Sequence, residues 1–193
     1  VNTPNTGERG AITLDQKERV NNGALFLQVT SEILSTLDAM AGLRLDRIRF
    51  DATDRLVTAT NPDDSGERTM QATSPSVGLT WRALPRLDLF ANYSESFETP
   101  TTSEPANREP GAGGSNPALE PQRTRSVELG LNGRVRVAGL AGTYQLTGSA
   151  ANVEDPLIPF EVASAPGRQY FRNAGSTNHR GLELGVSLVL PRN

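Results

Sequence analysis

The side chains best suited to acid–base or metal chemistry are few and widely separated in this sequence. His179 is the only histidine among 193 residues, and there is no cysteine. Two acidic pairs, Asp63-Asp64 and Glu154-Asp155, have no second histidine or cysteine to complete a metal site. We expect solvated loop acids, with calcium ligation as the open alternative. The sequence therefore predicts no catalytic residue, no metal site and no cofactor.

Two long polar segments instead carry side chains that suit the binding of a charged ligand. Guanidinium groups pair with anions, and arginine also stacks on aromatic rings. The alternative is that these side chains are solvated or pack against the protein. The candidate ligand-binding residues are Asn107, Arg108, Glu109, Arg168, Tyr170 and Arg172.

The elements around these segments alternate apolar and polar residues. In residues 87–96, Leu87, Leu89 and Tyr93 alternate with Asp88 and Asn92. Side chains alternate across a strand, so such a run has one apolar and one polar face. No stretch shows a helical stripe of comparable length. Seven strands are expected, in residues 24–34, 37–50, 77–82, 87–96, 126–137, 143–150 and 182–190, the last beginning as early as Arg168.

Short and long connections alternate between these runs. Residues 1–22 are polar and are expected to form a loop. Outer-membrane barrels show this alternation, with short periplasmic turns and longer extracellular loops. The expected short turns are 35–36, 83–86 and 138–139, and the expected long connections are 54–68, 98–122 and 154–167.

The second run changes phase part-way along. Leu43 and Leu45 share one face, whereas Ile48 and Phe50 lie on the other. A β-bulge after Leu45 would explain the change, and so would the end of an apolar band.

Composition narrows the choice of fold class and partner further. There is no run of about 18 apolar residues, which excludes a transmembrane helix. A net charge of −3 with scattered basic residues gives no reason to expect a nucleic-acid partner. Strands can cross lipid only as a closed barrel. We predict an all-β fold, an antiparallel up-and-down segment of a transmembrane β-barrel, with a soluble β-sandwich as the alternative. Trp81, Tyr93 and Tyr144, on the apolar faces near strand ends, would then lie at the membrane interfaces.

Several short motifs resemble the barrel of TonB-dependent outer-membrane receptors. Residues 93–101, YSESFETPT, are similar to the family's S-x-S-F-R-x-P strand end, with Glu98 where arginine is usual. Residues 116–122, NPALEPQ, are similar to N-P-x-L-x-P-E, with Gln122 in place of glutamate. Residues 126–130, SVELG, resemble the strand that follows, and residues 171–175 and 180–184 resemble a later strand with N-x-G and G-x-E.

The resemblance implies a receptor with a 22-stranded barrel and an N-terminal plug. Residues 1–193 would be a partial barrel domain of about seven strands, without the plug. The implied function is TonB-dependent uptake of a ferric siderophore or similar metal chelate across a Gram-negative outer membrane, without enzymatic chemistry. The implied partners are the cargo, outer-membrane lipid, and the TonB–ExbB–ExbD system through regions outside this chain. A passive porin or adhesin-like barrel and a soluble β-sandwich binding module are the alternatives.

Overall fold

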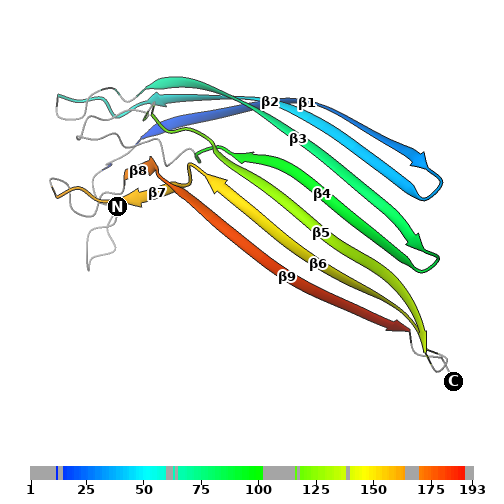
Figure 1. Ribbon diagram of the computed structural model, residues 1–193. Helices are drawn as coiled ribbons and strands as arrows, with labels where there is room; N and C mark the ends of the chain where they lie inside the picture. The colour runs from blue at the N-terminus through cyan, green and yellow to red at the C-terminus, as the bar shows by residue number, and fades with distance from the viewer. Residues whose placement is uncertain are drawn as a thin grey trace.

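Long antiparallel strands make up most of the chain. The computed structural model describes Ile12, residues 15–59, Asp63, residues 65–101, Asn116, and residues 118–137, 140–163 and 170–189. The strands in this part are β1 (Gln16–Leu34), β2 (Leu37–Asp54), β3 (Gly66–Leu84), β4 (Leu87–Glu98), β5 (Gln122–Val137), β6 (Leu140–Glu154), β7 (Leu157–Phe160), β8 (Tyr170–Asn173) and β9 (Ser176–Val189). Seven of them form one sheet in the order β1-β2-β3-β4-β5-β6-β9, and β7 pairs with β8 separately (Figure 1).

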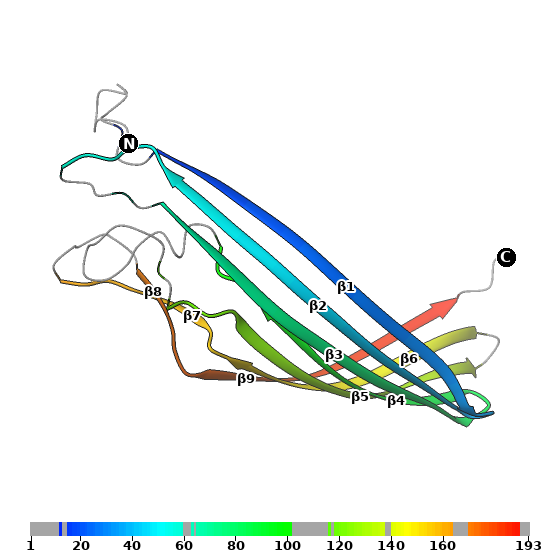
Figure 2. The same cartoon turned by 90° about the horizontal axis from the view of Figure 1, so that it is seen from above.

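The sheet is curved, and its two ends differ (Figure 2). Two-residue turns at 35–36 and 85–86 lie at one end. The connections between β2 and β3, β4 and β5, and β6 and β9 lie at the other (Figure 1). The predicted seven-stranded meander with alternating short and long connections is confirmed for these connections. The predicted turn at 138–139 lies outside the described residues.

One face of the sheet is apolar and uncovered. The ladder pairs Leu27 with Leu43 and Leu129 with Ala91, so outward-facing apolar residues of neighbouring strands lie side by side. Leu25 is 71% exposed and Leu182 is 76% exposed. No second sheet covers this face in the part of the chain that the structure describes. A water-soluble β-sandwich would bury these side chains, so that alternative is wrong, and the face suits lipid.

The phase change in β2 marks the end of the apolar band. Pairing between β1 and β2 continues without a shift from Val20 opposite Phe50 to Leu27 opposite Leu43, so there is no bulge here. Ile48 turns to the inner face and is buried, and its partner Met70 on β3 is buried as well. Apolar side chains therefore change sides where the outward face leaves the lipid.

Aromatic side chains lie at the short-turn end and over glycines. Trp81 is outward-facing and half exposed, opposite Leu37 and Leu89. The ring of Tyr144 covers Gly133 on this outer face, where a Cβ would overlap the ring. A cross-strand ring over glycine buries apolar surface and fixes the register of the pair.

Three predicted strand limits are wrong. The third strand, expected over residues 77–82, begins at Gly66. Residues 16–22, expected as loop, are the first part of β1 and pair with residues 48–54 of β2. The last strand does not extend back towards Arg168: a break at Ala174-Gly175 separates β8 from β9, which begins at Ser176. In these places the outward face is polar or a tight turn intervenes, so alternation with an apolar outward face does not report the strand.

Replacing an outward-facing leucine with arginine should destabilise the wall. For Leu129→Arg in the full-length protein we expect a loss of up to about 2–4 kcal/mol, because the charge would lie within the apolar band. Glu128→Arg places the same side chain on the inner face of the same strand and should change stability far less. The folded fraction after graded heating, read from electrophoretic mobility in lipid vesicles, measures both. Equal losses would contradict the assignment of the faces.

Candidate functional site

The β7–β8 hairpin projects from the long-connection end of the sheet. Its four pairs run from Leu157 opposite Asn173 to Phe160 opposite Tyr170. At its base, Asp155 and Gly175 adopt positive φ angles of 55° and 69°. The N–H of Asp155 donates to the carbonyl of Gly175 at 3.3 Å, and that of Ala174 to the carbonyl of Pro156 at 3.1 Å. Because left-handed backbone suits glycine and is tolerated by aspartate, this base redirects the chain out of the main sheet.

Asn173 joins this hairpin to the connection between β4 and β5. Its side-chain oxygen accepts the N–H of Glu120 at 2.7 Å, and its Nδ2 donates to the carbonyl of Glu120 at 2.8 Å. The same Nδ2 also donates to the carbonyl of Asp155 at 2.7 Å. One amide thus satisfies backbone groups of two segments that are far apart in sequence. We call this arrangement the Asn173 clamp.

Arg68 and Asn116 hold the same connection against the inner wall. The guanidinium of Arg68, on β3, donates to the carbonyl of Asn116 at 3.2 Å and to the carboxylate of Glu120 at 3.3 Å. Asn116 accepts the N–H of Ala118 at 3.0 Å and donates to the carbonyl of Phe171 at 3.4 Å. The segment around Leu119, whose side chain is 1% exposed, is thereby packed rather than free in solvent.

Only two of the six predicted ligand-binding residues, Tyr170 and Arg172, lie in the described part of the chain. Asn107, Arg108, Glu109 and Arg168 lie outside the described residues. Tyr170 and Arg172 come together on β8, next to Phe160 of β7.

Tyr170 and Arg172 differ in what they expose. Tyr170 is 1% exposed, and its ring centroid lies 5.8 Å from that of Phe160. Arg172 is exposed, with its guanidinium carbon 5.1 Å from the centre of the Phe160 ring. Burial makes Tyr170 a packing residue in this arrangement, whereas Arg172 offers a free cationic surface held over an aromatic ring.

Sequence reasoning missed Phe160 and Asn173 as part of this site. Asn173 does lie in a segment that resembles a family motif, and Glu120 lies in another. Nothing in either segment predicts that the two would be hydrogen-bonded to each other across 53 residues.

Of the titratable residues singled out from sequence, Asp63 and Glu154 have local structural partners, and Asp64 lies outside the described residues. Asp63 accepts a hydrogen bond from the backbone of Ser65 at 2.8 Å, and its bonds to the Ser65 side chain and backbone hold the pKa of Asp63 below its usual range. Glu154 accepts a bond from Arg125 at 2.6 Å. His179 lies exposed on the inner face of β9, opposite Ala151. Among the described residues, no three His, Cys, Asp or Glu side chains are placed to hold a metal ion.

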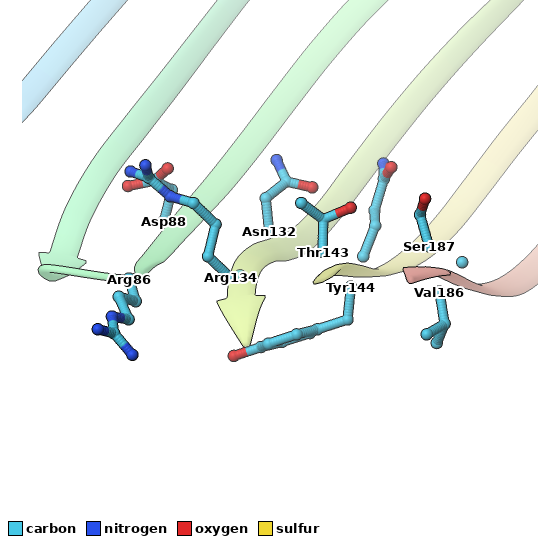
Figure 3. Close-up of a pocket in the computed structure, with 11 residues that line it drawn as sticks. Arg86, Asp88, Asn132, Arg134, Thr143, Tyr144, Val186 and Ser187 are labelled. Carbon is cyan, nitrogen blue, oxygen red and sulfur yellow. The ribbon is translucent and has the colours of Figure 1, made fainter. Parts of the chain in front are cut away.

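The inner face is mainly polar, although it also carries Ile48 and Met70. Near the long connections, Asp46 is buried and its carboxylate accepts two bonds from Arg44, at 2.8 and 2.9 Å, so the charge is paired. At the short-turn end, polar side chains line a hollow of about 490 Å³ (Figure 3). Asp88, Asn132 and Thr143 point to one side of the sheet there, whereas Tyr144 and Val186 point to the other (Figure 3). The polar set forms an inner wall that water can wet.

Comparison with known proteins identifies the family. A family model for the TonB-dependent receptor-like beta-barrel matches residues 1–190. The chain belongs to the TonB-dependent receptor family. Receptors of this family lie in the outer membrane of Gram-negative bacteria, so the apolar face meets lipid. The long connections, including the Asn173 clamp, are extracellular, and the short turns are periplasmic.

Individual relatives match over most of this chain. It is 29% identical over 171 residues to the metal-pseudopaline receptor CntO of Pseudomonas aeruginosa, covering 88% of this chain and 22% of that receptor. The hemophore receptor HasR of Serratia marcescens has the same fold, with a TM-score of 0.73 at 21% identity over 89% of this chain and 32% of that one. The copper transporter OprC gives 0.71 at 21% identity over 91% and 27%. The chain thus spans roughly a fifth to a third of the length of these proteins.

The described part of this receptor chain contains no helix with the length and apolarity needed to cross a membrane.

Removing the Asn173 side chain should free the two extracellular segments without unfolding the wall. Asn173→Ala deletes three hydrogen bonds of about 1 kcal/mol each, so backbone amide exchange around Glu120 and Asp155 should accelerate at least about tenfold. Hydrogen–deuterium exchange of the full-length receptor measures this. Asn178→Ala is the matched control. Asn178 lies on β9 and accepts one hydrogen bond from Asn152 of β6 at 3.1 Å, away from Glu120 and Asp155. If both variants left these segments equally protected, the clamp would have no role in ordering them.

Proposed function

We propose that this chain forms part of the barrel wall and extracellular mouth of a receptor that imports a ferric siderophore or a similar metal chelate. The match to the family model over residues 1–190 carries the proposal. The names of the relatives support metal-bearing cargo, since one is a metal-pseudopaline receptor, one binds a hemophore and heme, and one is a copper transporter. The receptor would capture and translocate its cargo and perform no covalent chemistry.

Energy for uptake would come from the TonB–ExbB–ExbD system through regions outside this chain. The described sheet would supply about seven strands of a larger, 22-stranded barrel, with residues 1–193 forming a partial barrel domain. The family match favours this arrangement over a passive porin, because TonB-dependent receptors are coupled to the inner membrane and passive porins are not.

The mouth residues fit an anionic chelate. Arg172 presents an exposed cation, and the ring of Phe160 beneath it limits how far the guanidinium can move. A fixed guanidinium can bind carboxylate, catecholate or hydroxamate oxygens through paired hydrogen bonds, and a restrained side chain loses less entropy on binding. Asn107, Arg108, Glu109 and Arg168 are proposed as further contacts, with Tyr170 as their buried support.

Uptake assays with the full-length receptor test the function. Cells carrying it should take up one class of metal chelate under metal limitation, and uptake should stop when TonB is deleted. A panel of ferric siderophores, other metal–chelate complexes and haem would identify the cargo. Uptake that persists without TonB would point to passive passage and overturn the proposal.

Replacing Arg172 should weaken capture of an anionic chelate. For Arg172→Gln we expect a loss of about 5- to 30-fold in equilibrium affinity, corresponding to the roughly 1–2 kcal/mol of one charged contact. Binding of the chelate found by uptake, measured on the detergent-solubilised receptor by fluorescence quenching, provides the value. Arg136→Gln, at the periplasmic end of β5, is the matched control and should bind as the unmodified receptor does. Equal affinity for both variants would remove Arg172 from the cargo site.

A further inference from the structure

Arg172 lies between two residues that are both hydrogen-bonded to the connection between β4 and β5. On one side, the Nδ2 of Asn116 donates to the carbonyl of Phe171 at 3.4 Å. On the other side, Asn173 makes two hydrogen bonds with the backbone of Glu120, at 2.7 and 2.8 Å. The connection therefore holds β8 immediately before and immediately after Arg172.

Arg68 attaches the same two residues of the connection to the barrel wall. Its guanidinium donates to the carbonyl of Asn116 at 3.2 Å and to the carboxylate of Glu120 at 3.3 Å. Arg68 lies on β3, on the same face as buried Met70, and its side chain is only 17% exposed. Hydrogen bonds from a charged donor in a partly buried place are stronger than those in open water. We call Asn116 and residues 118–120, held between Arg68 and β8, the strap.

Burial supports these hydrogen bonds. Leu119 of the strap is 1% exposed, and Tyr170 of β8 is 1% exposed as well. Lifting the strap away from the mouth would bring Leu119 into contact with water, which is unfavourable for an apolar side chain. The strap and β8 are therefore each packed into the mouth and are not held by hydrogen bonds alone.

The base of the β7–β8 hairpin is a narrow connection to the main sheet. β7 and β8 form a two-stranded sheet apart from the seven-stranded one. The chain enters and leaves the hairpin through Asp155 and Gly175, which have positive φ angles and share one backbone hydrogen bond of 3.3 Å. Because a lone two-stranded hairpin is marginally stable in water, its orientation depends on further support. Phe160 holds the guanidinium of Arg172 relative to the hairpin, whereas the strap holds the hairpin relative to the wall.

We propose that Arg68 is a positioning residue for Arg172, acting through the strap and the Asn173 clamp. Its guanidinium fixes the strap on the inner face of β3, the strap fixes residues 171 and 173, and Arg172 between them is held at one place in the extracellular mouth. Arg68 itself does not contact the cargo. A cation at a fixed place loses less entropy on binding an anion than a cation on a moving hairpin. The consequence for capture rests on the proposed function, in which Arg172 binds an anionic chelate, whereas the positioning itself does not.

The distance between two spin labels tests the positioning without any cargo. This chain has no cysteine, so Ile158→Cys on β7 and Gln71→Cys on β3, both exposed, can be labelled in the full-length receptor once any cysteine outside the chain is replaced by serine. Pulsed electron paramagnetic resonance then gives the distribution of distances between hairpin and wall. Arg68→Gln removes the charge that holds the strap, and it should broaden this distribution at least about twofold.

Arg49→Gln is the matched control. Arg49 lies on neighbouring β2, opposite Thr69, and is likewise paired with acids, Asp51 and Glu67, but on the outer face. This variant should leave the distribution unchanged. Arg68→Lys keeps the charge but loses the planar set of donors, so it should give an intermediate width. A distribution as narrow in Arg68→Gln as in Arg49→Gln would overturn the proposal.

Binding of ferric citrate, a ferric tris-catecholate and haem links the positioning to capture. A double-mutant cycle combines Arg68→Gln with Arg172→Gln. For a probe bound through Arg172, Arg68→Gln alone should reduce the affinity about threefold to tenfold, and it should reduce the affinity no further once Arg172 is replaced. Fully additive losses would mean that Arg68 acts on the probe by itself, and the positioning role would be wrong.

The two measurements also separate this proposal from the proposed function. If no probe responds to Arg172→Gln while Arg68→Gln still broadens the distance distribution, Arg172 is removed from cargo capture but its positioning by Arg68 stands. Heat-modifiable electrophoretic mobility verifies that each variant is folded.

Discussion

The backbone hydrogen-bond ladder is the constraint on which the rest of the wall depends. Lipid offers no partner for an amide or carbonyl group, so every strand in it must be paired on both sides. Pairing in the seven-stranded sheet shifts only beside the two short turns, after Glu32 and after Arg82. Since the register does not slip, the leucines and valines of neighbouring strands stay on the outward face over the full height of the band. A shift of one residue would move leucines into the lumen and charges into the lipid.

The hydrogen-bond ladder also extends beyond the membrane, where it no longer requires an apolar outward face. Above the apolar band both faces meet water, so the outward face no longer needs apolar residues. Ile48 and Met70 turn inward and are buried, and the connection around Leu119 packs at this end as well. The extracellular mouth is therefore built on strand ends and held by specific hydrogen bonds of Arg68 and Asn173. A ligand site on such a base is better ordered than one on free loops.

Each strand has one face towards lipid and one towards the lumen. On the inner face the buried carboxylate of Asp46 is paired with Arg44, which limits the cost of burying it. On the outer face of the described strands, charged residues follow directly above the apolar band, as Arg47 does on β2 and Arg125 on β5. Arg125 is paired with Glu95 and Glu154, whereas no ion pair joins Lys17 or Arg47 to an acid among the described residues. The outer face thus provides a surface for lipid that is independent of the inner wall and the mouth.

The sequence by itself determined the elements that lipid imposes. Alternation in the runs around Leu25, Leu43 and Leu129, together with alternating short and long connections, was enough for an antiparallel membrane sheet of seven strands, because lipid requires one apolar face and a regular register. It failed where that requirement ends: residues 16–22 form a strand without alternation, β7 lies in a segment expected to be loop, and β8 is separate from the last strand, which was expected to begin at Arg168. Only the tertiary structure brought Asn173 to Glu120 and Phe160 beneath Arg172, because these contacts join segments through single side chains that leave no periodic signal. Only the pairing of β1 with β2 placed Arg19 and Arg47 on one surface, since their proximity depends on strand register rather than on distance along the chain.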